Sequence, residues 1–196
     1  MNAVVFDLGN VVIDWNPLRV VSEAFVTETD FFAWNAQLDL GVPFDDVAAR
    51  WAAAHPAHES EVRVFQERWM DTLGAVDQDV LALIDELRAA GQRVFGLTNS
   101  HALTLRSPKV QRVFDHLEGV VVSGDIGLAK PDPAIFEHTA QRFGLTPSAT
   151  WFVDDNEANV VAATACGWNG VRFIDAVALR DELSAAGLVP AGGRSS

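Results

Sequence analysis

The chain has 196 residues, of which 49% are hydrophobic and 21% are charged, a composition typical of a globular protein with material for a sizeable core. Its formal net charge of −13 opposes binding to nucleic acid, because that affinity comes largely from Lys and Arg on phosphates. The single cysteine, Cys166, excludes an intrachain disulfide, and no run approaches the ~20 apolar residues that span a bilayer. We therefore expect a cytoplasmic protein with no nucleic-acid or membrane partner.

The chain opens with a short buried strand, which the continuous apolar run at residues 3–7 predicts and which ends at Asp7. From Pro17 to about Gly74 the pattern becomes helical throughout, with apolar residues three and four positions apart. This segment carries three of the six tryptophans, which we interpret as packing residues: Trp34, Trp51 and Trp69.

After Gly74, helices and strands alternate, which is typical of a parallel sheet with helices on both faces. We predict helices at 77–91, 132–144, 157–166 and 176–187, and strands at 93–100, 119–125, 150–155 and 170–175. The expected fold is α/β, with a Rossmann-like three-layer core around a mostly parallel sheet, formed by residues 1–15 and 75–196. Residues 16–74 are expected to form a small all-helical cap, inserted after the first strand.

Reactive side chains follow the predicted strands, at the edge of the sheet where ligands bind in such folds. They are Asp7, then Thr98 and Asn99, then Lys130, and finally Asp154 and Asp155. Each alone has a structural interpretation, as a cap, a turn residue or a solvated lysine. The adjacent pair Asp154 and Asp155 is harder to explain in this way, because like charges need a cation or several donors to remain ionised.

The order of these stretches resembles the haloacid dehalogenase superfamily of hydrolases, in which they correspond to the four signature motifs. The quoted stretches are "FDLGNV" at residues 6–11, "TN" at 98–99, "KP" at 130–131 and "DD" at 154–155. "FDLGNV" with a following Asp also looks like the subgroup that includes bacterial glucose-1-phosphate phosphatases and the N-terminal phosphatase-like domain of epoxide hydrolases. The size and position of the helical insertion are similar to those of the family's cap.

The resemblance implies phosphoryl transfer through an aspartyl-phosphate, with Asp7 as the nucleophile. It implies Mg²⁺, bound by Asp7, the backbone oxygen of Gly9, Asp155, and Asp154 directly or through water. Thr98, Lys130 and the backbone amides of Leu8 and Gly9 would hold the phosphoryl oxygens, and Asn99 would position the phosphate or the cap. The expected substrate is a small phosphorylated metabolite, with a sugar phosphate preferred, and the protein is expected to be a monomer or a homodimer.

Gly9 departs from the family pattern, because most phosphatases of the family carry there a second aspartate that acts as general acid and base. Such catalysis is typically worth ~10²–10⁴-fold. One interpretation is a phosphatase that uses a good leaving group or another acid, for which Asp14 is a candidate. A second is a 2-haloacid dehalogenase, with Arg19 or Arg50 on the substrate carboxylate. A third is a non-catalytic metabolite-binding protein. His101, close to the second motif, is interpreted as a surface histidine.

Overall fold

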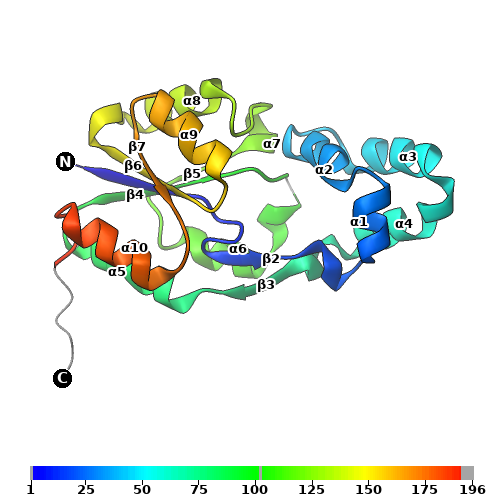
Figure 1. Cartoon of the computed structure of the whole chain (residues 1–196), viewed down its shortest axis with the longest axis horizontal. Helices are drawn as coiled ribbons and strands as arrows, with labels where there is room; N and C mark the ends of the chain where they lie inside the picture. The colour runs from blue at the N-terminus through cyan, green and yellow to red at the C-terminus, as the bar shows by residue number, and fades with distance from the viewer. Residues whose placement is uncertain (1, 102, 191–196) are drawn as a thin grey trace.

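The centre of the molecule is a five-stranded sheet, fully parallel, in the order β5-β4-β1-β6-β7 (Figure 1). The computed structural model describes residues 2–101 and 103–190; Met1 and residues 191–196, which the predicted core also included, lie outside the described residues. The predicted α/β fold with a parallel sheet between two helical layers is confirmed. The strands are β1 (Ala3–Phe6), β4 (Arg93–Thr98), β5 (Val120–Val122), β6 (Thr150–Asp154) and β7 (Asn169–Arg172).

Alternation along β1 explains the two helical layers. Val4 and Phe6 point into one apolar core, and Ala3 and Val5 point into the other, as the two-residue period of a strand requires. The helices α5 (Gln78–Ala89), α6 (Pro108–Phe114) and α10 (Ala176–Ala185) cover the first face; α8 (Pro133–Phe143) and α9 (Glu157–Ala165) cover the second (Figure 1).

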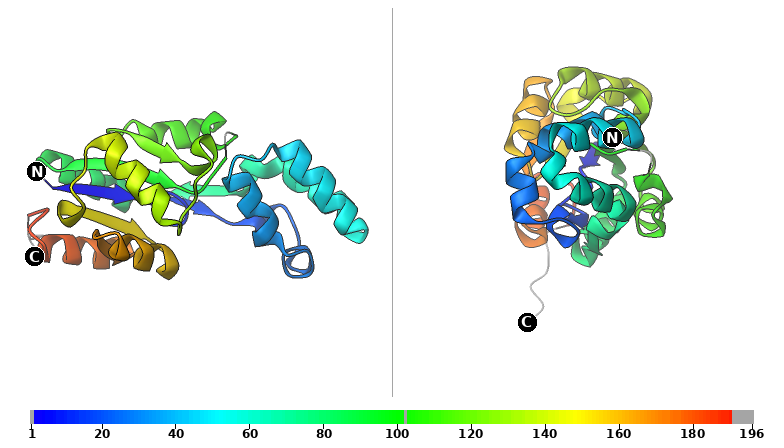
Figure 2. Two further views of the ribbon diagram at one scale, coloured as in Figure 1. Left: turned by 90° about the horizontal axis from the view of Figure 1, so that it is seen from above. Right: turned by 90° about the vertical axis from the view of Figure 1, so that its right-hand side faces the viewer.

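A cluster of short helices lies at one end of the sheet and has a core of its own (Figure 2). The rings of Phe25, Phe31, Trp51 and Phe65 are fully buried there, and the Phe25 and Trp51 centroids are 4.9 Å apart. We call α1–α4 the helical cluster: α1 (Glu23–Glu28), α2 (Phe31–Asp39), α3 (Phe44–Ala54) and α4 (Glu59–Arg68), with single 3₁₀ turns at Pro17–Arg19, Pro56–His58 and Trp69–Thr72.

An antiparallel ribbon of two short strands joins the helical cluster to the sheet. Its strands are β2 (Ile13–Trp15) and β3 (Leu73–Val76), which pair where the chain leaves the sheet and where it returns. The sequence pattern had assigned Leu73 and Gly74 to the helical segment. The backbone pairing with a strand almost sixty residues away decides their conformation, and no local pattern encodes such a partner.

Two further differences from the predicted elements lie close to the sheet edge. The strand expected at 119–125 ends at Val122, because the chain turns into α7 (Ser123–Ile126), where the Gly124 amide donates to the Ser100 carbonyl at 3.0 Å. The helix α6 had no predicted counterpart. Among the described residues, no helix combines the length and apolarity that crossing a membrane would need.

Candidate active site

Asp7 lies directly after β1, where its backbone still pairs with the sheet. Its amide donates to the Val153 carbonyl at 2.8 Å, and its own Oδ1 accepts the amide of Leu8 at 2.7 Å. The residue is only 8% exposed, and this burial raises the pKa of the Asp7 carboxyl to about 7, against the opposing effect of Lys130. A carboxylate in this position needs a charged partner.

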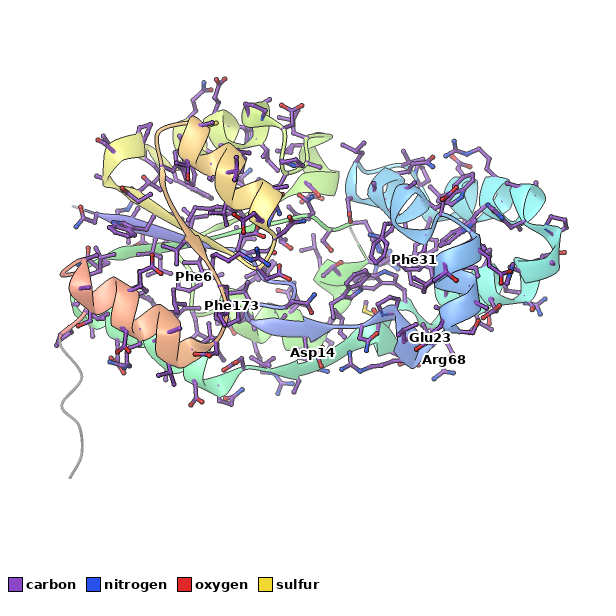
Figure 3. All side chains as sticks on the ribbon, viewed as in Figure 1. Phe6, Asp14, Glu23, Phe31, Arg68 and Phe173 are labelled. Carbon is purple, nitrogen blue, oxygen red and sulfur yellow. The ribbon has the colours of Figure 1, made fainter. Side chains whose placement is uncertain are left out.

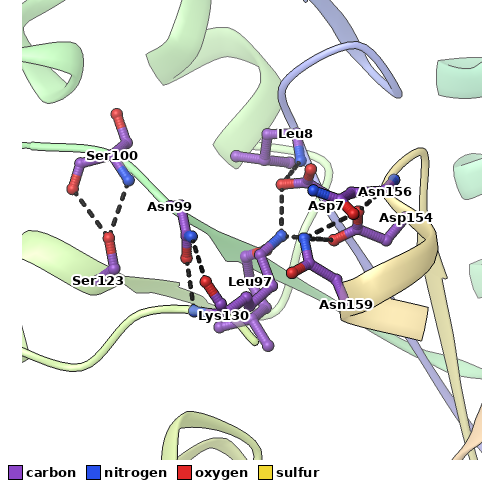
Figure 4. A network of polar contacts seen from close by, with 10 residues as sticks. All are labelled: Asp7, Leu8, Leu97, Asn99, Ser100, Ser123, Lys130, Asp154, Asn156 and Asn159. Atoms are coloured by element: carbon purple, nitrogen blue, oxygen red, sulfur yellow. Dashed lines mark hydrogen bonds and ion pairs between the residues drawn. The ribbon is translucent and has the colours of Figure 1, made fainter. Parts of the chain in front are cut away.

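Lys130 supplies that partner from the loop before α8 (Figure 4). Its Nζ lies 2.8 Å from Asp7 Oδ1 and 2.7 Å from Asp154 Oδ2, and it also donates to the Leu97 carbonyl at 3.0 Å. All three ammonium donors are therefore used. Burial disfavours the charged form of Lys130, but the carboxylates of Asp7 and Asp154 outweigh this effect and raise its pKa.

Asp154, at the end of β6, is fully buried behind the nucleophile. Its Oδ1 accepts the Asn156 amide at 2.8 Å, and both of its oxygens accept from Asn159 Nδ2, at 3.1 and 3.0 Å (Figure 4). The helix α9 is capped by Asn156, whose side chain accepts the Ala158 amide at 2.9 Å. Asp154 and Asp155 are thus not needed as helix caps.

Three carboxylates come together at this edge of the sheet. One ligand atom from each of Asp7, Asp154 and Asp155 can be chosen so that all three lie within 4.8 Å of one another. Burial, and then the neighbouring Asp154, raise the pKa of Asp155. One ammonium cannot balance three negative charges, and carboxylate oxygens are the ligands that Mg²⁺ prefers. The donor set therefore fits a divalent cation.

Thr98 ends β4, on the other side of Asp7, and Asn99 follows it. Thr98 is 6% exposed and lines the same pocket as the nucleophile. Asn99 holds the backbone of Lys130: its Nδ2 donates to the Lys130 carbonyl, and its Oδ1 accepts the Lys130 amide, both at 2.8 Å. The amide side chain that was predicted to contact phosphate or cap thus also fixes the loop that carries the ammonium.

A pocket of about 300 Å³ opens above these residues. The sheet edge provides its floor, which includes the predicted site residues except Asp154: Asp7, Leu8, Gly9, Thr98, Asn99, Lys130 and Asp155. Its other walls come from the ribbon, from the helical cluster and from the segment 104–114, with Trp15, Phe32, Asn35, Asp39 and Trp69 among the lining residues.

Asp39 is the lining residue of most chemical interest that the sequence analysis missed. Its Oδ2 accepts from Asn35 Nδ2 at 3.2 Å, and burial raises its pKa to about 7, with Lys130 acting in the opposite direction. No pattern distinguishes it from the other acidic residues of the helical segment. Its importance depends on where α2 ends relative to the sheet.

Three residues that the sequence analysis considered lie elsewhere. Asp14 lies on the β2–β3 ribbon (Figure 3), where it forms an ion pair with Arg19. The Arg19 Nη1 donates to the Thr72 carbonyl at 2.8 Å, and Arg50 is exposed. No arginine is among the described residues that line the pocket.

The interpretation of His101 as a surface histidine is wrong. The side chain is 6% exposed and packs against two rings of the helical segment, with centroids 4.4 Å from Trp69 and 5.4 Å from Phe44. Burial lowers its pKa to about 4. The helical segment folds back over this part of the loop after β4, which its local sequence does not reveal.

Comparisons with known proteins agree with this geometry. Sesquiterpene phosphatase astK of Aspergillus oryzae is 28% identical over 188 residues, which cover 92% of this chain and 94% of that protein. (S)-2-haloacid dehalogenase 4A of Burkholderia cepacia is 30% identical over 99 residues, covering 48% of this chain and 42% of that protein. A HAD family enzyme from Bacteroides thetaiotaomicron has the same fold, with a TM-score of 0.69 and 21% identity over 88% of this chain and 93% of that one.

One structure of the Bacteroides enzyme is a complex with magnesium and inorganic phosphate. The family model described as haloacid dehalogenase-like hydrolase matches residues 1–167. This match covers the strands β1, β4, β5 and β6, the helical cluster and every residue of the site described above, and it ends before β7. The resemblance noted from the four motifs is thereby confirmed, and the chain belongs to the haloacid dehalogenase-like hydrolases.

Proposed function

We propose that this hydrolase is a Mg²⁺-dependent phosphatase, which cleaves a small phosphomonoester through a phosphorylated Asp7. The observation that carries the proposal is the meeting of three carboxylates and one fully paired ammonium beneath a single pocket. Phosphatases among the relatives, such as astK, support the reaction class.

In this proposal, the residues of the floor perform the attack, bind the phosphoryl group and bind the cation. Asp7 attacks phosphorus, and Thr98 and the amides of Leu8 and Gly9 hold the phosphoryl oxygens. Lys130 would join them by exchanging one of its three present contacts for a phosphoryl oxygen. Asp7, Asp155, Asp154 and the backbone oxygen of Gly9 hold the cation. A bound Mg²⁺ would screen the repulsion between the attacking carboxylate and the phosphate.

We also propose that residues 16–74 act as a cap over the core, which residues 1–15 and 75–196 form. The separate apolar core of the helical cluster and its thin connection through β2 and β3 support this division. Pocket walls contributed by both parts are what a cap that excludes water from the reacting atoms requires.

The substrate's organic group is proposed to carry apolar surface. Trp15, Phe32 and Trp69 line the pocket, together with aliphatic side chains of the segment 104–114. An alkyl, prenyl or aryl phosphate would bury its organic group against these apolar side chains, and we therefore propose it in place of the sugar phosphate preferred on sequence grounds.

The dehalogenase alternative is less well supported. Attack on a 2-haloacid needs a cationic clamp for the substrate carboxylate, and the pocket's described lining includes no arginine that could form one. Two further acidic groups at 154 and 155 would repel such a substrate.

The test is phosphate release from a panel of phosphomonoesters, with Mg²⁺ and with EDTA. We expect Mg²⁺-dependent release that Asp7→Asn abolishes and Asp155→Asn reduces strongly. The matched control is Asp46→Asn, which removes an exposed carboxylate on α3 that does not line the pocket. Halide release from 2-chloropropionate in EDTA would instead identify a dehalogenase, and tight binding of a metabolite without turnover would identify a binding protein.

A further inference from the structure

We infer that Asp39, from the helical cluster, donates the proton to the leaving oxygen and later takes one from the attacking water. It would thus perform the acid–base role that Gly9 cannot. The inference rests on the proposed phosphatase function and adds to it a catalytic residue from outside the four motifs.

Asp39 faces the same pocket as the nucleophile. Asp39 ends α2 and lines the pocket that Asp7 and Lys130 line from below. The pocket has two further carboxylates among its described residues, Asp7 and Asp155, and the proposed mechanism uses both for attack and metal binding. Asp39 is therefore the carboxyl group left for proton transfer, and it approaches from the side where the organic group would lie.

The position of the missing aspartate, Gly9, has free space around it. A Cβ built on Gly9 has no atom within 4 Å, and the glycine is not in the left-handed region of backbone conformation. No side chain of the core has taken the place of an aspartate there. The space beside the nucleophile is open, so that a group from the helical cluster can reach a leaving oxygen bound next to Asp7.

A close backbone contact fixes the end of α2. Gly41, two residues after Asp39, has φ +83°, and a Cβ on it would lie 2.3 Å from the Gly124 carbonyl oxygen in α7. Only glycine allows this approach. The two segments lie side by side in Figure 1, where α2 and α7 meet. The helical cluster is thus held against the core next to the carboxyl that has to be positioned.

Local contacts also suit Asp39 for proton transfer. Asn35, one helical turn earlier in α2, donates to Asp39 Oδ2 and so orients the carboxyl group. Burial raises its pKa to about 7, so that both protonation states are accessible near neutral pH, as acid and then base catalysis requires. Lys130 is the charged side chain that acts on this pKa. The elements packed against α2 carry Glu23 and Glu28 on α1, Asp45, Asp46 and Arg50 on α3, and Asp125 on α7.

The two chemical steps balance as follows. As Asp7 Oδ forms its bond to phosphorus, the bond from phosphorus to the ester oxygen breaks, and the Asp39 proton goes to that oxygen, so the alcohol leaves neutral. A water then attacks the phosphorus of the aspartyl-phosphate, gives one proton to the Asp39 carboxylate, and releases Asp7 and inorganic phosphate. Overall, ester and water become alcohol and phosphate, and Asp39 regains its proton.

The test compares leaving groups in Asp39→Asn, a variant of nearly the same shape. An alkyl phosphate needs a proton on its leaving oxygen, whereas 4-nitrophenolate leaves without one. We expect kcat/KM to fall about 10²–10⁴-fold for the alkyl phosphate, the usual contribution of general acid catalysis, and far less for 4-nitrophenyl phosphate. The wild type should lose alkyl phosphatase activity as the pH rises through about 7, and the variant should lack this alkaline limb.

A second variant makes the result independent of folding defects. Gly9→Asp, made in the Asp39→Asn background, places an acid in the open space and should restore much of the alkyl phosphatase activity. Asp46→Asn is the matched control and should change neither substrate's rate. Equal losses on the two substrates, no loss on either, or no gain from Gly9→Asp would overturn the role of Asp39. Failure of the phosphatase function itself would be seen separately, as phosphate release that survives Asp7→Asn.

Discussion

Asn99 and Lys130 are joined by a reciprocal pair of hydrogen bonds, in which one side-chain amide satisfies both the N–H and the C=O of a single residue. Both distances are 2.8 Å. The end of β4 is thereby tied to the loop before α8, and the Lys130 ammonium reaches two carboxylates from a fixed backbone. The second and third motifs therefore act together as one unit.

Asn99→Ala should reduce catalysis through Lys130. Losing two partly buried hydrogen bonds is expected to lower the free energy of unfolding by about 1–3 kcal/mol. A displacement of the ammonium by about 1 Å is expected to lower kcat on the order of 10²-fold. Stopped-flow or steady-state phosphate release, together with urea denaturation, would measure both effects.

Asn169→Ala is the matched control for this variant. Asn169, at the start of β7, also donates its amide to backbone carbonyls, of Ser148 at 3.2 Å and Thr150 at 3.1 Å, but it does not line the pocket. The Asn169→Ala variant should be less stable than the wild type and should have the same kcat. Equal kcat values for Asn99→Ala and the wild type would show that the pair serves the fold alone.

The sheet could be predicted from the sequence because its signals are local. Continuous apolar runs predicted β1, β4 and β6. Asp132 marked the start of α8, where its side chain accepts the Ala134 amide. The β2–β3 ribbon escaped prediction, because its short strands are stabilised by each other across the whole helical cluster.

The floor of the pocket could be predicted for the same reason, since parallel strands bring their carboxyl ends to one edge. The roof could not. Asp14 was considered as the acid because it is close to Asp7 in sequence, but β2 carries it away along the ribbon, where Arg19 pairs with it. Asp39 is 32 positions from Asp7, and only the packing of α2 against α7 brings it over the site.

Lys130→Met should make the protein depend on a divalent cation for stability. The substitution keeps the length of the side chain but leaves the Asp7 and Asp154 carboxylates without their cation. Breaking such a buried pair costs about 3–5 kcal/mol, so the melting temperature in EDTA should fall by many degrees. A divalent cation bound by the same carboxylates would offset this loss, and Mg²⁺ should raise the melting temperature more in the variant than in the wild type.

Lys109→Met provides the comparison for that experiment. Its ammonium donates to backbone carbonyls, including that of Leu73 at 3.1 Å, and it forms no ion pair with a carboxylate among residues 2–101 and 103–190. The variant should lose stability without gaining any response to Mg²⁺. An identical Mg²⁺ response in the Lys130 variant and the wild type would argue against cation binding by Asp7 and Asp154.

His101 should make the protein less stable in mild acid. Burial lowers its pKa from 6.5 to about 4 in the folded state, so the unfolded chain binds a proton more readily over this range. Stability is therefore complete above pH 6.5 and is lost as the pH falls from 6.5 towards 4, by at most about 3 kcal/mol. His101→Leu, which keeps an apolar contact with Trp69 and Phe44, should flatten this part of the profile.

The measurement is the free energy of unfolding by urea at pH 7.5, 6, 5 and 4.5. Replacement of His116, a partly exposed residue that pairs with Asp85, should leave the His101 contribution in place. Parallel profiles for His101→Leu and the wild type would mean that the histidine is protonated in the folded state, contrary to its burial between the two rings.

Phe32 should affect substrate affinity without affecting the fold. The ring is 63% exposed although it lines the pocket, and it projects from α2, the helix that carries Asp39. An apolar group bound in the pocket would cover this ring, and burying a phenylalanine side chain contributes about 1.5–3 kcal/mol. Phe32→Ala should therefore raise KM for an alkyl or aryl phosphate about tenfold or more, with kcat and melting temperature nearly unchanged.

Val177→Ala, at a position that is 72% exposed in α10 and outside the pocket, should change none of these quantities. For a short polar phosphomonoester, which cannot reach the ring, KM should be the same in Phe32→Ala and the wild type. An equal rise in KM for polar and apolar substrates would show that the apolar walls do not select the substrate. Phe32 would then act on the position of α2 instead.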